Sequence, residues 1–140
     1  AKNKELVTHS LRLITKNDIL GKISNLSIKY YENNGLTKEC YNEFARVVEE
    51  NANLDKEWDQ FRILFEEVHQ NFFTTLKQSF PDLTSHDLRF CSYIKINLAT
   101  KEIAKLLNIS PSTVRTFKYR LKVRFKLNSE TSLEDYLSAI

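Results

Sequence analysis

Glycine and proline are scarce in this chain, which has only two of each among its 140 residues. Tight turns and β-hairpins depend on these residues, because glycine adopts and proline fixes backbone angles that other residues avoid. A chain with so few of them has little material for a sheet of short strands, so we expect an all-α fold. The length suits one domain with a core that needs no disulfide or metal.

Apolar residues recur at helical spacing through the first thirty residues. Leu6, Leu13 and Leu20 are seven apart, which predicts one long amphipathic helix. Part of this leucine row is a candidate for a seam between two copies of the chain. The run NNG at 33–35 predicts the end of the helix, with Gly35 in the left-handed conformation.

Two further helices are predicted before residue 81. One covers about 38–53, and the other runs from about 55 to 80 and ends before Pro81, which disfavours helical geometry in the residue preceding it. The second of these carries an aromatic-rich stripe at steps of three and four, whose members are Trp58, Phe61, Phe65, Val68 and Phe72. The stripe is wide enough to pack on two neighbours, so we interpret it as core.

Four short helices are predicted after residue 82, each with its own start signal. The signals are the capping-box pair Thr84 and Asp87, Thr100, Ser110 followed by Pro111, and the capping-box pair Thr131 and Glu134. The segment 82–87 is therefore the predicted boundary between residues 1–80 and residues 82–140.

Basic residues concentrate in one segment of an otherwise balanced chain. Residues 101–126 hold eight of the 21 lysines and arginines but only one of the 18 acids, Glu102. Such asymmetry favours a polyanionic partner, although a basic run can also be an ordinary solvated helix face. The neighbouring sequence distinguishes a surface for a polyanion from a solvated helix face.

That neighbouring sequence predicts a helix-turn-helix. TKEIAKLL forms a short apolar helix, NIS is a tight turn, and Val114, Phe117, Leu121 and Phe125 then step by three, four and four. In such a motif the second helix lies in the major groove of DNA. We therefore expect a recognition helix over about 111–125.

The face opposite these apolar residues carries the candidate DNA contacts. Arg115 and Thr116 lie in the first turns, where side chains reach base edges, and Ser112 and Tyr119 share their face. Lys118, Arg120, Lys122 and Arg124 are better placed to neutralise phosphates, which gives affinity without sequence information.

At the level of motifs, LTxxxL at 83–88, TKEIAKLLNIS at 100–110 and the following STVRTFKYRLKVRFKL resemble the LuxR-type (NarL/FixJ) helix-turn-helix. The resemblance covers about residues 82–140. It implies four helices, DNA binding through the third of them, and dimerisation.

The resemblance also implies roles for single residues. The base-reading position of the family falls on Arg115, with groove-facing positions on Thr116 and Tyr119, and phosphate contacts fall on Lys101, Thr113 and Lys122. The sequence departs from the family pattern at two places. Phe117 replaces the usual histidine but fits the buried face, and Asn97 replaces the usual glycine but tolerates a left-handed turn.

Residues 1–80 resemble, more weakly, the region that precedes this motif in large bacterial sensory regulators. That likeness implies a helical or coiled-coil dimerisation segment between upstream sensory domains and the DNA-binding part. A chain that begins with Ala1 and lacks methionine fits a fragment of such a protein. We therefore predict a transcriptional regulator that binds double-stranded DNA as a homodimer.

Other classes of protein fit less well. Two glycines leave no phosphate-cradling loop, and no nucleophile and base occur together, so we expect neither an enzyme nor a cofactor. His9, His69, His86, Cys40 and Cys91 lack metal-ligand spacing, and two unpaired cysteines suit the cytoplasm. The longest apolar runs are too short for a membrane span, and we expect no membrane contact.

Two alternatives remain open at this stage. One is an oligomerisation or signal-relay module whose basic helix docks an acidic protein partner. The other is a sigma-factor-like promoter-binding domain.

Overall fold

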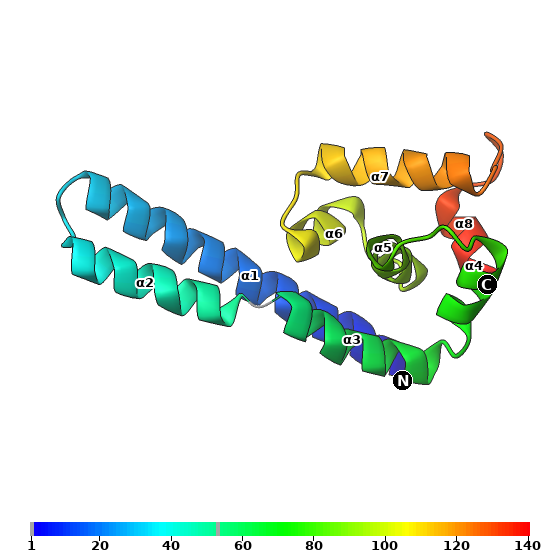
Figure 1. The fold of residues 1–140 in the computed structure, drawn as a ribbon, viewed down its shortest axis with the longest axis horizontal. Coiled ribbons are helices and arrows are strands. Elements are labelled where there is room, and N and C mark those ends of the chain that lie inside the picture. The colour runs from blue at the N-terminus through cyan, green and yellow to red at the C-terminus, as the bar shows by residue number, and fades with distance from the viewer. Residues whose placement is uncertain (1, 53) are drawn as a thin grey trace.

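The computed structural model describes residues 2–52 and 54–140, with side chains from Glu5 to Ala52 and from Lys56 to the end. Its described residues form helices and loops and contain no strand, so the all-α prediction is confirmed. Figure 1 shows a long helical hairpin that extends from a more compact body of shorter helices. The helices are α1 Lys2–Glu32, α2 Lys38–Asn51, α3 Leu54–Val68, α4 Phe72–Ser79, α5 Ser85–Lys95, α6 Thr100–Leu107, α7 Pro111–Arg124 and α8 Leu133–Ser138.

The turn between α1 and α2 differs from its prediction in one residue. Asn34, with a φ of 61°, takes the left-handed conformation, whereas Gly35 does not have a positive φ. The N–H of Gly35 instead donates to the carbonyl of Tyr30 at 2.7 Å. Asparagine serves here because it tolerates positive φ better than most residues do.

The prediction of one continuous helix over 55–80 is wrong. The helix ends at Val68 and resumes at Phe72, because Asn71 takes a left-handed φ of 69°. The break redirects the chain, so that α4 leaves the line of α3 and turns towards α8 (Figure 1). Phe72 then packs edge-on against Phe65 of α3, with ring centroids 5.3 Å apart. Ring packing between the two pieces stabilises the bend.

The start signals after residue 82 are largely confirmed. Thr84 and Asp87 form the predicted capping box, and Ser110 caps α7 with Pro111 in its first turn. Asn97 has the left-handed φ of 64° that its position requires. The last helix begins one residue later than predicted, since Ser132 rather than Thr131 is the cap and accepts from the Asp135 N–H.

One hydrophobic cluster joins the two parts of the chain. It includes Leu6 of α1 and Phe61 of α3 together with Tyr93 of α5 and Ile103 of α6, all almost fully buried. α1 packs against α2, α3 and α6, while α8 packs against α5 and α7. The boundary near residue 82 therefore separates two stretches of sequence that share a core.

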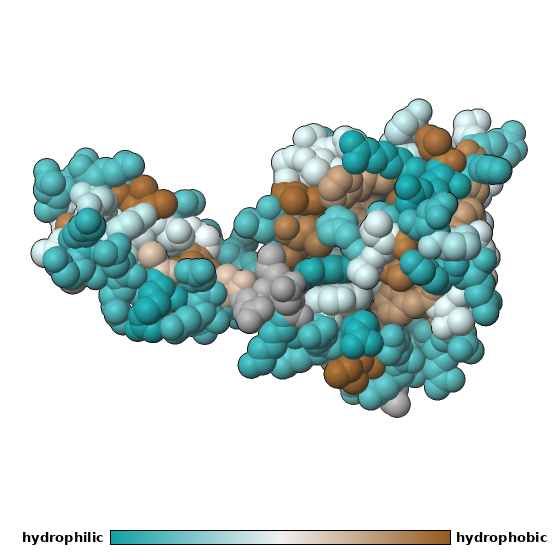
Figure 2. Space-filling model, in the orientation of Figure 1, coloured by the Kyte–Doolittle hydropathy of each residue, from teal (hydrophilic) through white to brown (hydrophobic). Residues whose placement is uncertain are grey.

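The outer part of the α1–α2 hairpin, residues 19–51, is here called the arm. Large apolar side chains remain exposed along it, and Figure 2 shows them scattered between polar residues on the visible face. Leu6, the first member of the predicted leucine seam, is instead buried in the core of its own chain. The exposed arm residues are Ile19, Ile23, Leu26, Ile28, Tyr30, Tyr31, Phe44 and Val47.

Among the described helices, none combines the length and the apolar character needed to cross a membrane.

Candidate nucleic-acid interface

α6 and α7 have the geometry of a helix-turn-helix. Asn108, in the left-handed conformation at φ 55°, ends α6, and two residues later the Ser110 hydroxyl accepts the Thr113 N–H at 3.2 Å to start α7. The turn is short because an asparagine stops one helix and a serine cap starts the next. The predicted supporting helix, turn and second helix are thus present in order.

One face of α7 is fixed in the core. Val114 and Leu121 are buried, as is Phe125 at the end of the helix, and Phe117 is half-buried against the rings of His86 and Phe90. This confirms the apolar face that the spacing predicts. The orientation of α7 about its own axis is therefore set by packing.

The opposite face carries the three predicted base-contacting residues. Arg115 and Thr116 are exposed, and the Tyr119 ring is 69% exposed on the next turn. The Thr116 hydroxyl donates to the Ser112 carbonyl at 3.1 Å, so the hydroxyl is occupied by the helix backbone. The structure brings these side chains onto one accessible surface, as their spacing implies.

The predicted phosphate-contacting residues lie around this surface. Lys101 is exposed in the first turn of α6, and Ser112 is exposed at the start of α7. Thr113 is half-buried with its hydroxyl 2.8 Å from that of Ser110. Arg120 is exposed and stacks its guanidinium 5.9 Å from the centre of the Phe117 ring, while Lys122 is half-buried.

Lys118 lies apart from the other cations of α7. Its ammonium donates to the Thr100 hydroxyl at 2.9 Å and pairs with a Glu134 carboxylate oxygen at 3.1 Å, and its side chain is only 20% exposed. Burial raises the pKa of Glu134, but the backbone N–H of Glu134 and the nearby Lys118 together outweigh burial and lower that pKa. Lys118 thus connects α7 to the starts of α6 and α8.

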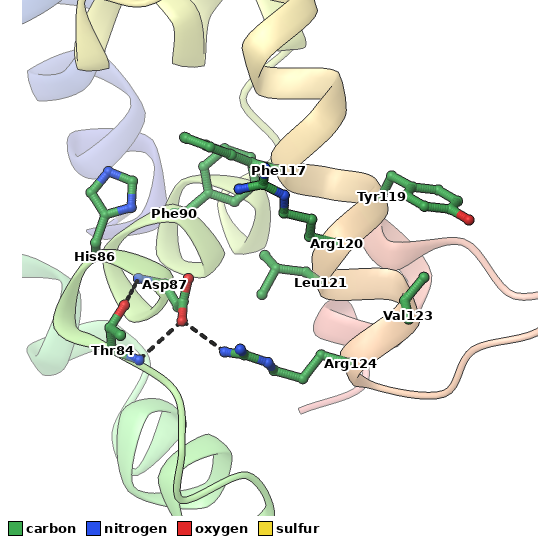
Figure 3. A pocket seen from close by; sticks show the side chains of 10 residues that line it. All are labelled: Thr84, His86, Asp87, Phe90, Phe117, Tyr119, Arg120, Leu121, Val123 and Arg124. Atoms are coloured by element: carbon green, nitrogen blue, oxygen red, sulfur yellow. Dashed lines mark hydrogen bonds and ion pairs between the residues drawn. The ribbon is translucent and has the colours of Figure 1, made fainter.

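A groove of about 610 Å³ runs between α7 and the start of α5 (Figure 3). Phe90, Phe117 and Leu121 contribute apolar surface to it. At one end the Asp87 carboxylate accepts the Thr84 N–H at 3.0 Å and pairs with Arg124 at 3.0 Å. Tyr119 and Arg120 of α7 also line this groove, so the groove borders the exposed face of the helix (Figure 3).

The capping box of α5 could be predicted from the sequence, but these longer-range pairs could not. Arg124 is 37 residues from Asp87, and Lys118 is 18 residues from Thr100. No local signal distinguishes a lysine that faces DNA from one that reaches back to a neighbouring helix.

The described residues contain no group of three or more side chains of histidine, cysteine, aspartate or glutamate that could hold a metal ion. Burial raises the pKa of the Cys91 thiol to about 12, which keeps this thiol protonated.

Residues 82–137 match the family described as bacterial regulatory proteins, luxR family. These residues form a LuxR-family helix-turn-helix domain. The match begins just before α5 and ends within α8, so the LuxR-family domain comprises the last four helices of Figure 1. Separate searches of curated proteins and of solved structures found no match.

The match of residues 82–137 to this family indicates DNA binding in transcription regulation. Helices α1–α4 lie outside the matched residues. The matched residues include the exposed face of α7, and the four preceding helices share the core of the LuxR-family domain.

Proposed function

We propose that this protein regulates transcription by binding a specific duplex DNA sequence with α7 in the major groove. The observation that carries this is the division of α7 into two faces. Val114 and Leu121 are buried, whereas Arg115, Thr116 and Tyr119 are exposed together with no protein partner covering them in the described residues. A helix held by one face and open on the other is what groove recognition requires.

The exposed face has chemistry that can distinguish bases. The guanidinium of Arg115 can donate two hydrogen bonds to the O6 and N7 atoms of guanine. The hydroxyl of Thr116 is bound to the helix backbone, which leaves its methyl group for contact with the thymine methyl. Tyr119 adds an aromatic ring and one hydroxyl on the following turn.

Phosphate contacts would come from the rim of this face. Lys101, Ser112, Thr113, Arg120 and Lys122 are the residues assigned to that role, together with the backbone N–H groups at the starts of α6 and α7. We leave Lys118 out, because its ammonium is already held by Thr100 and Glu134.

We further propose that the protein binds DNA as a homodimer through the helices before residue 81, with the arm as the contact. Phe44 and Val47 of α2 and Ile23 and Leu26 of α1 are each about half exposed, which is unusual for side chains of this size. A two-fold dimer would present two α7 helices to a partly palindromic site. Upstream sensory domains would act through the same helices, and the protein would work in the cytoplasm.

Binding of duplex DNA measured against salt concentration tests the proposed function. We expect the affinity for duplex DNA to fall steeply as the salt concentration rises. An excess of unrelated duplex should displace the cognate duplex from the protein only poorly. A protein that docks an acidic partner through α7 would instead bind duplex weakly and without sequence preference. That outcome would overturn the proposal.

Mass in solution tests the dimer separately. We expect a two-chain mass for the wild type and a one-chain mass for Val47→Arg, which places a charge on the arm. The matched control is Ile63→Arg, because Ile63 is 55% exposed on α3 and lies outside the arm. A one-chain mass for the wild type at micromolar concentration, or equal dissociation by both variants, would refute the arm contact.

A further inference from the structure

A hollow of about 470 Å³ lies between α1 and the helix-turn-helix. α1 contributes Asn17, Asp18, Gly21, Lys22 and Asn25 to its walls. α6, the turn after it and the start of α7 form the opposite wall. The residues of this wall are Lys101, Ala104, Lys105, Asn108, Ile109 and Pro111. Figure 1 shows α1 passing beside α6 before it continues into the arm.

The hollow is cationic. Three lysines, Lys22, Lys101 and Lys105, line it with a single carboxylate, that of Asp18. Asp18 is already paired with Lys105 at 3.1 Å. Among the described residues no carboxylate lies within ion-pair distance of Lys22 or Lys101, and both side chains are exposed. Two uncompensated ammonium groups around one concave surface favour a bound anion.

Gly21 borders the hollow at a point where α1 has no side chain. A Cβ added at this position would meet no atom within 4 Å, so the absence of a side chain leaves space rather than relieving a clash. Glycine weakens the middle of a helix by roughly 0.5–1 kcal/mol relative to alanine. In this helix the glycine lies at the wall of the hollow, next to Lys22.

The position of the hollow relates it to the proposed DNA surface. Lys101 is one of the proposed phosphate contacts, and Pro111 directly precedes Ser112 and Thr113, which are two others. A DNA strand held by these residues would pass along one rim of the hollow. Lys22 stands on the other rim, on a helix that lies outside the LuxR-family domain.

We infer that Lys22 of α1 is an additional DNA-binding residue, which contacts a backbone phosphate of the duplex bound by α6 and α7. The inference rests on the proposed function and extends the binding surface beyond the LuxR-family domain. It gives α1 a second role, because a helix that packs on α6 also contributes charge to the bound strand. Movement of α1 relative to α6 would then change affinity for DNA directly.

The test is the salt dependence of binding to the selected duplex by the whole chain. Each phosphate contact contributes about 0.9 to the slope of log affinity against log salt. We expect Lys22→Ala to lower the slope by about 0.9 for each chain bound. A fourfold rise in salt concentration should therefore reduce the DNA affinity of this variant roughly threefold less, per chain bound, than it reduces the affinity of the wild type. Lys22→Arg should retain the wild-type slope, because it keeps the charge.

Lys29→Ala is the matched control, since Lys29 is exposed on the same helix but does not line the hollow. It should leave the slope unchanged. Equal slopes for wild type and Lys22→Ala, with sequence-specific binding intact, would overturn this inference alone. Absence of salt-dependent duplex binding by the wild type would overturn the proposed function and this inference with it.

Discussion

Lys118 and Arg115 lie one turn apart on α7, yet their side chains face different surroundings. Arg115 is exposed on the open face, whereas the Lys118 ammonium is held by Thr100 of α6 and Glu134 of α8. Both residues were predicted to contact DNA. The direction of a long side chain depends on which partner is within reach, and here the nearest acceptors belong to the protein.

We predict that Lys118→Ala lowers the free energy of unfolding by about 1 kcal/mol, because Glu134 then lacks its ion-pair partner. The effect is modest, since the Glu134 side chain is half-exposed to water. Urea denaturation measures this. The variant should keep the wild-type salt slope for DNA binding. If the slope falls by about 0.9, Lys118 contacts a phosphate after all.

The same ion pair predicts a dependence on pH. The pKa of Glu134 in the folded protein lies below its ordinary value of 4.5, so the folded state favours the carboxylate. The contribution of the Glu134 carboxylate to the free energy of unfolding is complete above pH 4.5. It is lost as the pH falls through the lowered folded-state pKa. The stability difference between wild type and Lys118→Ala should therefore shrink as the pH falls below 4.5. A difference that stays constant over that range would contradict the pairing.

The exposed and buried faces of α7 could be predicted from the sequence because a helix repeats every 3.6 residues. Val114, Phe117 and Leu121 identify the inner face by spacing alone. The pairs from Lys118 to Glu134 and from Arg124 to Asp87 could not be predicted. These pairs depend on the positions of separate helices relative to one another. The spacing of residues within one helix does not determine those positions.

Helix ends were predicted well where a single local interaction determines them. Thr84 and Ser110 cap their helices through hydroxyl groups that accept a backbone N–H three residues on. The break between α3 and α4 was not predicted, because the steps of three and four continue across it from Val68 to Phe72. Ring packing between Phe65 and Phe72 follows from the bend, and that contact is tertiary.

Asn71 determines this break, and its substitution tests that role. We expect Asn71→Ala to lower the free energy of unfolding by about 1 kcal/mol, because alanine disfavours a positive φ. Asn71→Gly should be close to wild type, since glycine accepts that conformation. Thermal unfolding of the two variants measures the difference. Equal stability of both would show that the left-handed residue does not determine the break.

At the scale of the whole molecule, the four helices before residue 81 and the LuxR-family domain share one core. Trp58 of α3 reports on their junction, because its ring lies 6.1 Å from that of Tyr93 and 5.4 Å from the Arg89 guanidinium, both in α5. The sequence indicated a boundary near residue 82 but not this contact, which joins residues far apart in the chain.

We predict that the body of the protein unfolds as one cooperative unit. Trp58 is the single tryptophan, so its fluorescence follows the junction, while circular dichroism follows all helices. The two signals should give the same denaturant midpoint. A fluorescence change well before the loss of helix would mean that the two parts separate first.

Selection of bound duplexes from a random pool, by the wild type and by Arg115→Ala, tests the central claim most directly. The wild type should select one motif repeated with two-fold symmetry. Arg115→Ala should select the same motif with one base pair per half-site relaxed, a loss of about 1–3 kcal/mol of discrimination at that position. Recovery of no common motif by the wild type, or an identical motif from both proteins, would contradict base reading by α7.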